Sequence, residues 1–114
     1  MTLPEHIDVA NAGQIREELL SVINRGATEL VADMTATVSC DHAGADAVAR
    51  AYQRAAASGT QLRLAVPAPV VRRVLGINGL DRLIPIYPSL EAATTVAAPA
   101  TVTPPVPTRA APGR

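Results

Sequence analysis

The sequence predicts an α/β fold in which helices pack on a mostly parallel sheet. Short apolar runs at residues 29–34, 61–66 and 83–87 have the length and composition of buried strands. Between them lie longer stretches whose apolar residues recur at helical spacing, and strands that are joined through helices pair in parallel. A chain of 114 residues has room for one hydrophobic core. We therefore expect a single domain.

The first predicted helix starts near residue 11 and ends at the Asn-Arg-Gly stretch of residues 24–26. Asp8 and Asn11 precede its apolar repeat and are candidate caps. The first buried strand, "ELVADM", follows. The chain then reaches a polar corner, "VSCDHAGADAV" at residues 38–48, where an apolar run stops and an alanine-rich helical pattern begins. Because α/β proteins usually keep their function where strands end and helices begin, this corner is the first candidate site.

The second helix is predicted to begin near Gly44 and to break at Ser58-Gly59. After the next strand, Pro69 suits the first turn of a third helix, which Asn78-Gly79 ends. Pro85 lies in the last strand and cannot donate a ladder hydrogen bond, so this strand belongs at a sheet edge. A fourth helix is expected to start at the capping Ser89 and to fade near residue 97.

The last part of the sequence has a different composition. Residues 94–114 contain five of the ten prolines and no acidic residue, and they show no helical or strand period. We expect a disordered tail rich in Pro, Ala and Thr at 94–114, and the folded domain at 1–93. Cutting the chain after Ala97 is expected to leave its thermal stability nearly unchanged.

Composition argues against several classes of partner. The net charge is zero, so no basic surface for nucleic acid is expected. No apolar stretch approaches the roughly 20 residues of a membrane span, and the N-terminus lacks the features of a signal peptide. We expect a cytoplasmic protein. One cysteine and two histidines are too few for a zinc site, and nothing indicates a cofactor.

Several segments resemble the STAS domain of bacterial anti-anti-sigma factors. They are "LPEHID", "LVADM" followed by "DHAGA", and "VPAPVVRRVLGINGLD" followed by "PSLEAA", and the resemblance covers residues 3–93. It implies an anti-sigma factor antagonist, which sequesters an anti-sigma factor, often itself a kinase, and so frees a sigma factor. In this family the corner reads Asp, Ser, Ser or Thr, Gly, and the second hydroxyl is phosphorylated. Aligned on Asp41 and Gly44, that position is Ala43 here, so the phosphoacceptor is lost.

The resemblance places the partner-binding surface at Asp8, Asp41, His42, Ala43 and Gly44. For two of these the sequence leaves a structural role open, since Asp8 and Asp41 are also suited to capping helices. His42 is either a substitute phosphoacceptor or titratable contact, or a plain surface residue. Cys40 is interpreted as a small buried residue. Arg72 and Arg73 are interpreted as solvated charges, and the weaker alternative is that they contact carboxylates of a partner.

The N-terminus departs from the family pattern. Members usually begin with a pair of strands, but here only "TLPEH" precedes the first helix, so the N-terminal strand pair is truncated. An open sheet edge is therefore expected, and it leads to two hypotheses: self-association into a homo-oligomer through that edge, or a start codon upstream. Thr37 and Ser39 stand where the family has large apolar residues, which is expected to weaken the strand below the corner.

Three function classes follow from these observations. The first is the anti-sigma factor antagonist, not phosphorylated at position 43. The second is a structural STAS subunit of a signalling assembly that does not bind an anti-sigma factor. An enzyme is the weakest, since paired carboxylates, a phosphate-binding glycine loop and a nucleophile beside a base are all missing from the sequence. Cys40, Asp41 and His42 do not make a triad, because neighbours on an extended chain point to opposite faces.

Overall fold

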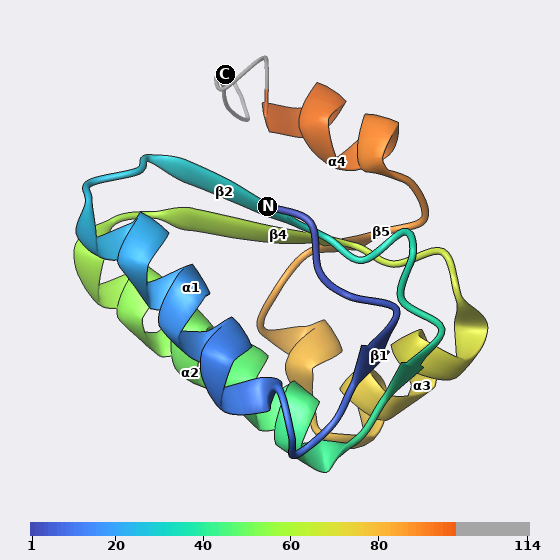
Figure 1. The fold of residues 1–114 in the computed structure, drawn as a ribbon. Helices are drawn as coiled ribbons and strands as arrows, with labels where there is room; N and C mark the ends of the chain where they lie inside the picture. The colour runs from blue at the N-terminus through green and yellow to red at the C-terminus, as the bar shows by residue number, and fades with distance from the viewer. Residues whose placement is uncertain (98–114) are drawn as a thin grey trace.

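The computed structural model describes residues 1–97 (Figure 1). Four α-helices and five short strands alternate along this part of the chain. In chain order they are β1 (His6–Ile7), α1 (Ala12–Asn24), β2 (Glu29–Asp33), β3 (Ser39–Cys40), α2 (His42–Ser58), β4 (Gln61–Ala65), α3 (Pro69–Ile77), a 3-10 turn (Leu80–Arg82), β5 (Ile86–Tyr87) and α4 (Leu90–Ala97). The α/β class is confirmed.

Every strand pair in residues 1–97 is parallel, as predicted. β2, β4 and β5 form one sheet in that order, and β1 pairs with β3 in a second, two-stranded sheet. β2 and β4 are paired over their full lengths, from Glu29 opposite Gln61 to Asp33 opposite Ala65. β5 is paired only with the last two residues of β4 and lies at the edge, where Pro85 was expected to place it.

Helices cover both faces of the three-stranded sheet. In Figure 1, α1 and α2 run side by side below β2 and β4, and α4 lies above them. Burial on both faces explains why four of the five residues of β4 are buried, instead of every second one. The core between the sheet and α1 and α2 is aliphatic, with large buried side chains such as Leu19, Ile23 and Leu64.

The helix boundaries differ from the predictions by two residues at most. α2 begins at His42 instead of Gly44, because Asp41 ends the extended chain and caps the helix from there. Ser89 caps α4 as expected, with its Oγ accepting from the Ala92 N–H at 3.0 Å. Residues 94–97, which the sequence assigned to the tail, form the end of α4. The rest of the predicted tail, 98–114, lies outside the described residues.

The expected open edge is partly paired, which corrects that expectation. The N-terminal segment, residues 1–7, runs parallel to β2 and β3: Thr2 bridges to Asp33, and β1 pairs with β3. The hydroxyls at positions 37 and 39 fix this segment, since Thr37 Oγ1 donates to the Pro4 carbonyl at 2.8 Å and Ser39 Oγ lies 2.7 Å from His6 Nδ1. These two polar residues therefore bind the segment through side-chain hydrogen bonds.

Candidate functional site

The candidate site is the amino end of α2, and Asp41 builds it. The backbone of Asp41 is extended, and its N–H donates to the carbonyl of Ile7 at 3.1 Å, which joins the corner to β1. Its carboxylate accepts from the Gly44 N–H at 3.0 Å, and its carbonyl accepts the first helical bond from Ala45. A carboxylate in this position satisfies a free N–H and complements the helix dipole. The capping role of Asp41 is therefore confirmed.

Gly44 lies where the first turn of α2 touches the strands. A Cβ at this position would be 2.5 Å from Ile7 Cγ2 and 2.7 Å from Cys40 Sγ. Carbon atoms in good contact are about 3.5–4.0 Å apart, so no side chain fits here. The missing Cβ lets the first turn of α2 pack directly on β1 and β3. Gly44 is buried and is consequently a positioning residue, not a surface contact.

Ala43 is half-buried and faces α1 across a shallow hollow of about 200 Å³. Val9 and Gly13 form the opposite side, and Asp46 and Arg16 lie at the rim. Val9 is 81 % exposed, so a large apolar side chain stands free beside the corner. The methyl group of Ala43 adds little bulk and no charge to this hollow.

His42 is exposed and contacts the carboxyl end of α3. Its Nδ1 lies 3.2 Å from Asn78 Nδ2 and 3.3 Å from Asn78 Oδ1. Asn78 Nδ2 also donates to the Val74 carbonyl at 2.8 Å, which fixes the amide at the end of that helix. Ile77, one residue before Asn78, is 70 % exposed. Exposed apolar residues therefore stand on two sides of the corner, Val9 before α1 and Ile77 at the end of α3.

Asp8 starts α1. Its carboxylate accepts from the Ala10 N–H at 2.9 Å, and its carbonyl accepts from the Ala12 N–H at 2.8 Å. Asn11 closes the turn by accepting from the Asp8 N–H at 2.9 Å through its side-chain oxygen. Asp8 is exposed, so its structural role leaves the carboxylate open to a partner.

The other residues that the sequence singled out do not line the hollow beside Ala43. Cys40 is buried, and this burial, together with the nearby Asp41 carboxylate, raises the pKa of its thiol to about 11, so the thiol is inert at neutral pH. Arg72 and Arg73 are exposed on α3, and no ion pair involves them in residues 1–97. Within the same residues no cluster of His, Cys, Asp or Glu could hold a metal ion, and no helix is long and apolar enough to cross a membrane.

Sequence reasoning missed the contributions of Val9, Ile77 and Asn78. Val9 falls between two capping residues, where no periodicity assigns it to a face. Ile77 ends an otherwise amphipathic helix, and its exposure depends on where that helix ends. The His42–Asn78 contact joins positions 36 residues apart in the chain, and local patterns carry no information on such contacts.

The parallel sheets and the four helices match the fold of solved anti-sigma factor antagonists. The STAS domain family matches residues 1–93, and the chain belongs to this family. Three solved structures illustrate the likeness. The crystal structure of TM1081 of Thermotoga maritima has 22 % identity and a TM-score of 0.74, with 82 % of each chain covered. An anti-sigma factor antagonist of Mycobacterium paratuberculosis has 26 % identity and a TM-score of 0.69, covering 83 % of this chain and 80 % of that one.

The third solved structure is that of the Bacillus cell fate determinant SpoIIAA in its phosphorylated form. It has 24 % identity and a TM-score of 0.62, covering 83 % of this chain and 86 % of that one. No curated protein matches the sequence. At these identities the likeness to solved structures establishes the fold.

Proposed function

We propose that this chain is an anti-sigma factor antagonist that binds an anti-sigma factor through the amino end of α2. The observation that supports this most is the corner itself. Asp41 caps the helix and Gly44 seats it on β1 and β3, so residue 43 is held beside Val9, at the hollow between α1 and α2. Exposed apolar side chains such as Val9 and Ile77 near a small, uncharged residue 43 suit close contact with a protein partner.

We also propose that this corner can bind its partner at all times, because it is not phosphorylated at position 43. Ala43 has no oxygen to accept a phosphoryl group, whereas the family carries a hydroxyl there. A phosphate at the start of α2 would be stable, because the free N–H groups and the dipole favour anions, but its charge of nearly −2 would disturb a close interface. The relative solved in its phosphorylated form is SpoIIAA. Without this modification the complex stays assembled until another signal acts.

The partner we propose is an anti-sigma factor of the kinase type, and the place of action is the cytoplasm. His42 contributes its imidazole to the same surface, and its contact with Asn78 through Nδ1 leaves Nε2 for a partner. Asp8 and the side of the Asp41 carboxylate that does not bind Gly44 supply acceptors for donors on the partner. Regulation of sigma-factor-dependent transcription follows from competition for the anti-sigma factor.

The experiment is calorimetric titration of four variants with the anti-sigma factors of the source organism. Ala43→Asp and Ala43→Glu should keep the fold and weaken the complex by about 1–3 kcal/mol, roughly 5-fold to 150-fold in affinity, through a charge buried without a partner. Ala57→Glu is the matched control, since it places the same residue at an exposed position near the other end of α2. Ala43→Ser should bind like the wild type and become phosphorylated if the partner has an active kinase site.

Circular dichroism verifies the fold of each variant. Equal affinities of Ala43→Glu and Ala57→Glu would show that the corner only caps a helix. Failure of the wild-type chain to bind any of these anti-sigma factors would favour a structural STAS subunit in a signalling assembly.

A further inference from the structure

A groove of about 410 Å³ lies at the free edge of β4, away from the corner. Tyr52 of α2 and Tyr87 of β5 line it, together with Pro85, Leu62 and Arg63. These are the only two tyrosines of the chain, and it has no Phe or Trp, so both of its aromatic side chains line one groove. The volume is within the range of small-molecule sites, roughly 300–1,000 Å³.

The short β5 leaves this edge open. The Leu64 N–H donates to the Pro85 carbonyl at 3.0 Å, and the Val66 N–H donates to the Tyr87 carbonyl at 2.8 Å. The backbone N–H and carbonyl groups of the even-numbered residues therefore point toward β5 and not toward β2. Continuing this register, the Leu62 carbonyl would need the N–H of residue 85, which proline lacks. By the same register the Leu62 N–H would donate to the Leu83 carbonyl, and this bond is not formed. The groove therefore has an unpaired donor and an unpaired acceptor in its wall.

Arg63 adds an unsatisfied charge. It is only 7 % exposed, and one guanidinium nitrogen, Nη2, donates to Gln61 Oε1. The other, Nη1, is buried and has no hydrogen-bond partner. No carboxylate of the described residues lies within ion-pair distance of it. A buried guanidinium without an anion is costly, so such groups are normally paired.

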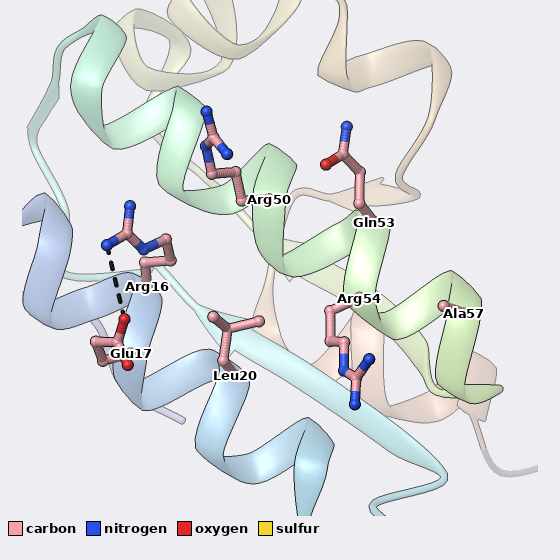
Figure 2. A pocket seen from close by; sticks show the side chains of 7 residues that line it. All are labelled: Arg16, Glu17, Leu20, Arg50, Gln53, Arg54 and Ala57. Carbon is pink, nitrogen blue, oxygen red and sulfur yellow. Dashed lines mark ion pairs between the residues drawn. The ribbon is translucent and has the colours of Figure 1, made fainter.

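The arginines in the hollow between α1 and α2 differ in this respect (Figure 2). Arg16 lies 3.6 Å from the Glu17 carboxylate, and Arg50 Nε lies 3.1 Å from Asp46 Oδ2. Arg54 Nε donates to Asn24 Oδ1 at 2.8 Å and is exposed. These side chains are solvated or already paired, and the hollow has no buried group that requires a ligand.

We propose that the groove beside β4 binds a small organic monoanion, a carboxylate on a flat apolar body. The carboxylate accepts a hydrogen bond from Arg63 Nη1, and the Leu62 N–H is a second donor in the same wall. A single guanidinium matches a single negative charge and suits carboxylate geometry. The apolar body lies against Tyr52, Tyr87 and Pro85. This site is at the amino end of β4, and its existence does not depend on the proposed function of the α2 corner.

The test is a titration of ¹⁵N-labelled full-length chain by nuclear magnetic resonance. The probes are benzoate and isovalerate, and the neutral control is benzamide, which has the shape of benzoate without its charge. We expect saturable shifts of the Leu62, Arg63 and Tyr87 amides with a carboxylate probe. Benzamide should bind at least about tenfold more weakly than benzoate. Arg63→Gln should reduce carboxylate binding to the benzamide level. Arg54→Gln is the matched control and should leave it unchanged.

The proposal is overturned by equal binding of benzoate and benzamide, by unchanged affinity in Arg63→Gln, or by an equal loss in Arg54→Gln. Shifts confined to the α1–α2 hollow, or no saturable shift with either carboxylate, would overturn it as well. Should Arg63→Gln fail to fold, hydrogen exchange of the wild-type Leu62 amide decides. Benzoate should slow this exchange at least several-fold more than benzamide, and equal rates would count against the site.

Discussion

Gly44→Ala tests whether the close contact between α2 and the strands holds the candidate site in place. The new Cβ would meet Ile7 Cγ2 at 2.5 Å and Cys40 Sγ at 2.7 Å, about 1 Å short of a normal contact. Overpacking of this kind costs about 1–3 kcal/mol, and the better helix propensity of alanine returns about 1 kcal/mol at most. We expect a net loss of about 1–2 kcal/mol and a melting temperature lower by about 5–15 °C.

Gly13→Ala is the matched control. Gly13 is also in the first turn of a helix, but a Cβ there would have no atom within 4 Å. This substitution should stabilise the protein by about 0.5–1 kcal/mol through the lower entropy of the unfolded chain. The assay is urea unfolding followed by circular dichroism, with calorimetric melting as a second measurement.

A double-mutant cycle identifies the atom responsible. Ile7→Leu removes the Cγ2 methyl while conserving side-chain volume. In that background Gly44→Ala should be less destabilising by about 0.5–1 kcal/mol, because the closest contact is gone. A Gly44→Ala variant as stable as Gly13→Ala, or the same cost in both backgrounds, would refute the argument that Ile7 and Cys40 exclude a side chain at position 44.

Two further predictions concern titration. Burial raises the pKa of the Cys40 thiol to about 11 from an ordinary 9.0, so the contribution of the thiol to the free energy of unfolding is complete below pH 9 and is lost as pH rises from 9 to 11. At pH 8 a thiol reagent should react slowly with Cys40 in the folded protein and fast in urea. Equal rates would contradict the burial of Cys40. The Thr35 hydroxyl and N–H hold the pKa of Asp33 below 3.8, so this carboxylate stabilises the fold above that pH and loses its effect as pH falls through the lowered pKa. Thr35→Val should raise the pKa of Asp33 toward 3.8, as ¹³C titration of its carboxyl would show, and an unchanged pKa would mean that the Thr35 hydroxyl is not the main cause.

Local signals predicted the elements that local chemistry determines. The strands of β2 and β4 were found within one residue at each end because short apolar runs between turn residues leave few alternatives. Asp41 was a candidate cap, beside its candidate role as a partner contact, because an acidic residue before an alanine-rich repeat can accept hydrogen bonds from the first free N–H groups of a helix. Pro85 indicated the edge position of β5 because proline lacks a donor.

Tertiary contacts account for what the sequence did not reveal. The pairing of residues 1–7 with β2 and β3 depends on Thr37 and Ser39, whose hydroxyls had been interpreted as a weakness of the strand. The burial of Arg63 was also missed, since "QLRLAV" suggests an ordinary strand with one charged side chain pointing to water. Its environment is formed with other elements of the fold, among them Tyr52 of α2 and Tyr87 of β5.

The parallel pairing of every described strand has a consequence for the order in which the chain acquires its structure. Every ladder joins strands that are far apart in the sequence: His6 pairs with Ser39, Glu29 with Gln61, and Leu64 with Ile86. Each ladder therefore closes a long loop, and contacts of this kind form slowly, whereas α1 and α2 depend mainly on local contacts. On the ribosome β2 must wait until residue 61 and those after it have emerged. During that interval its apolar face and backbone edge are exposed, so early synthesis is the stage at which this chain is most prone to aggregate.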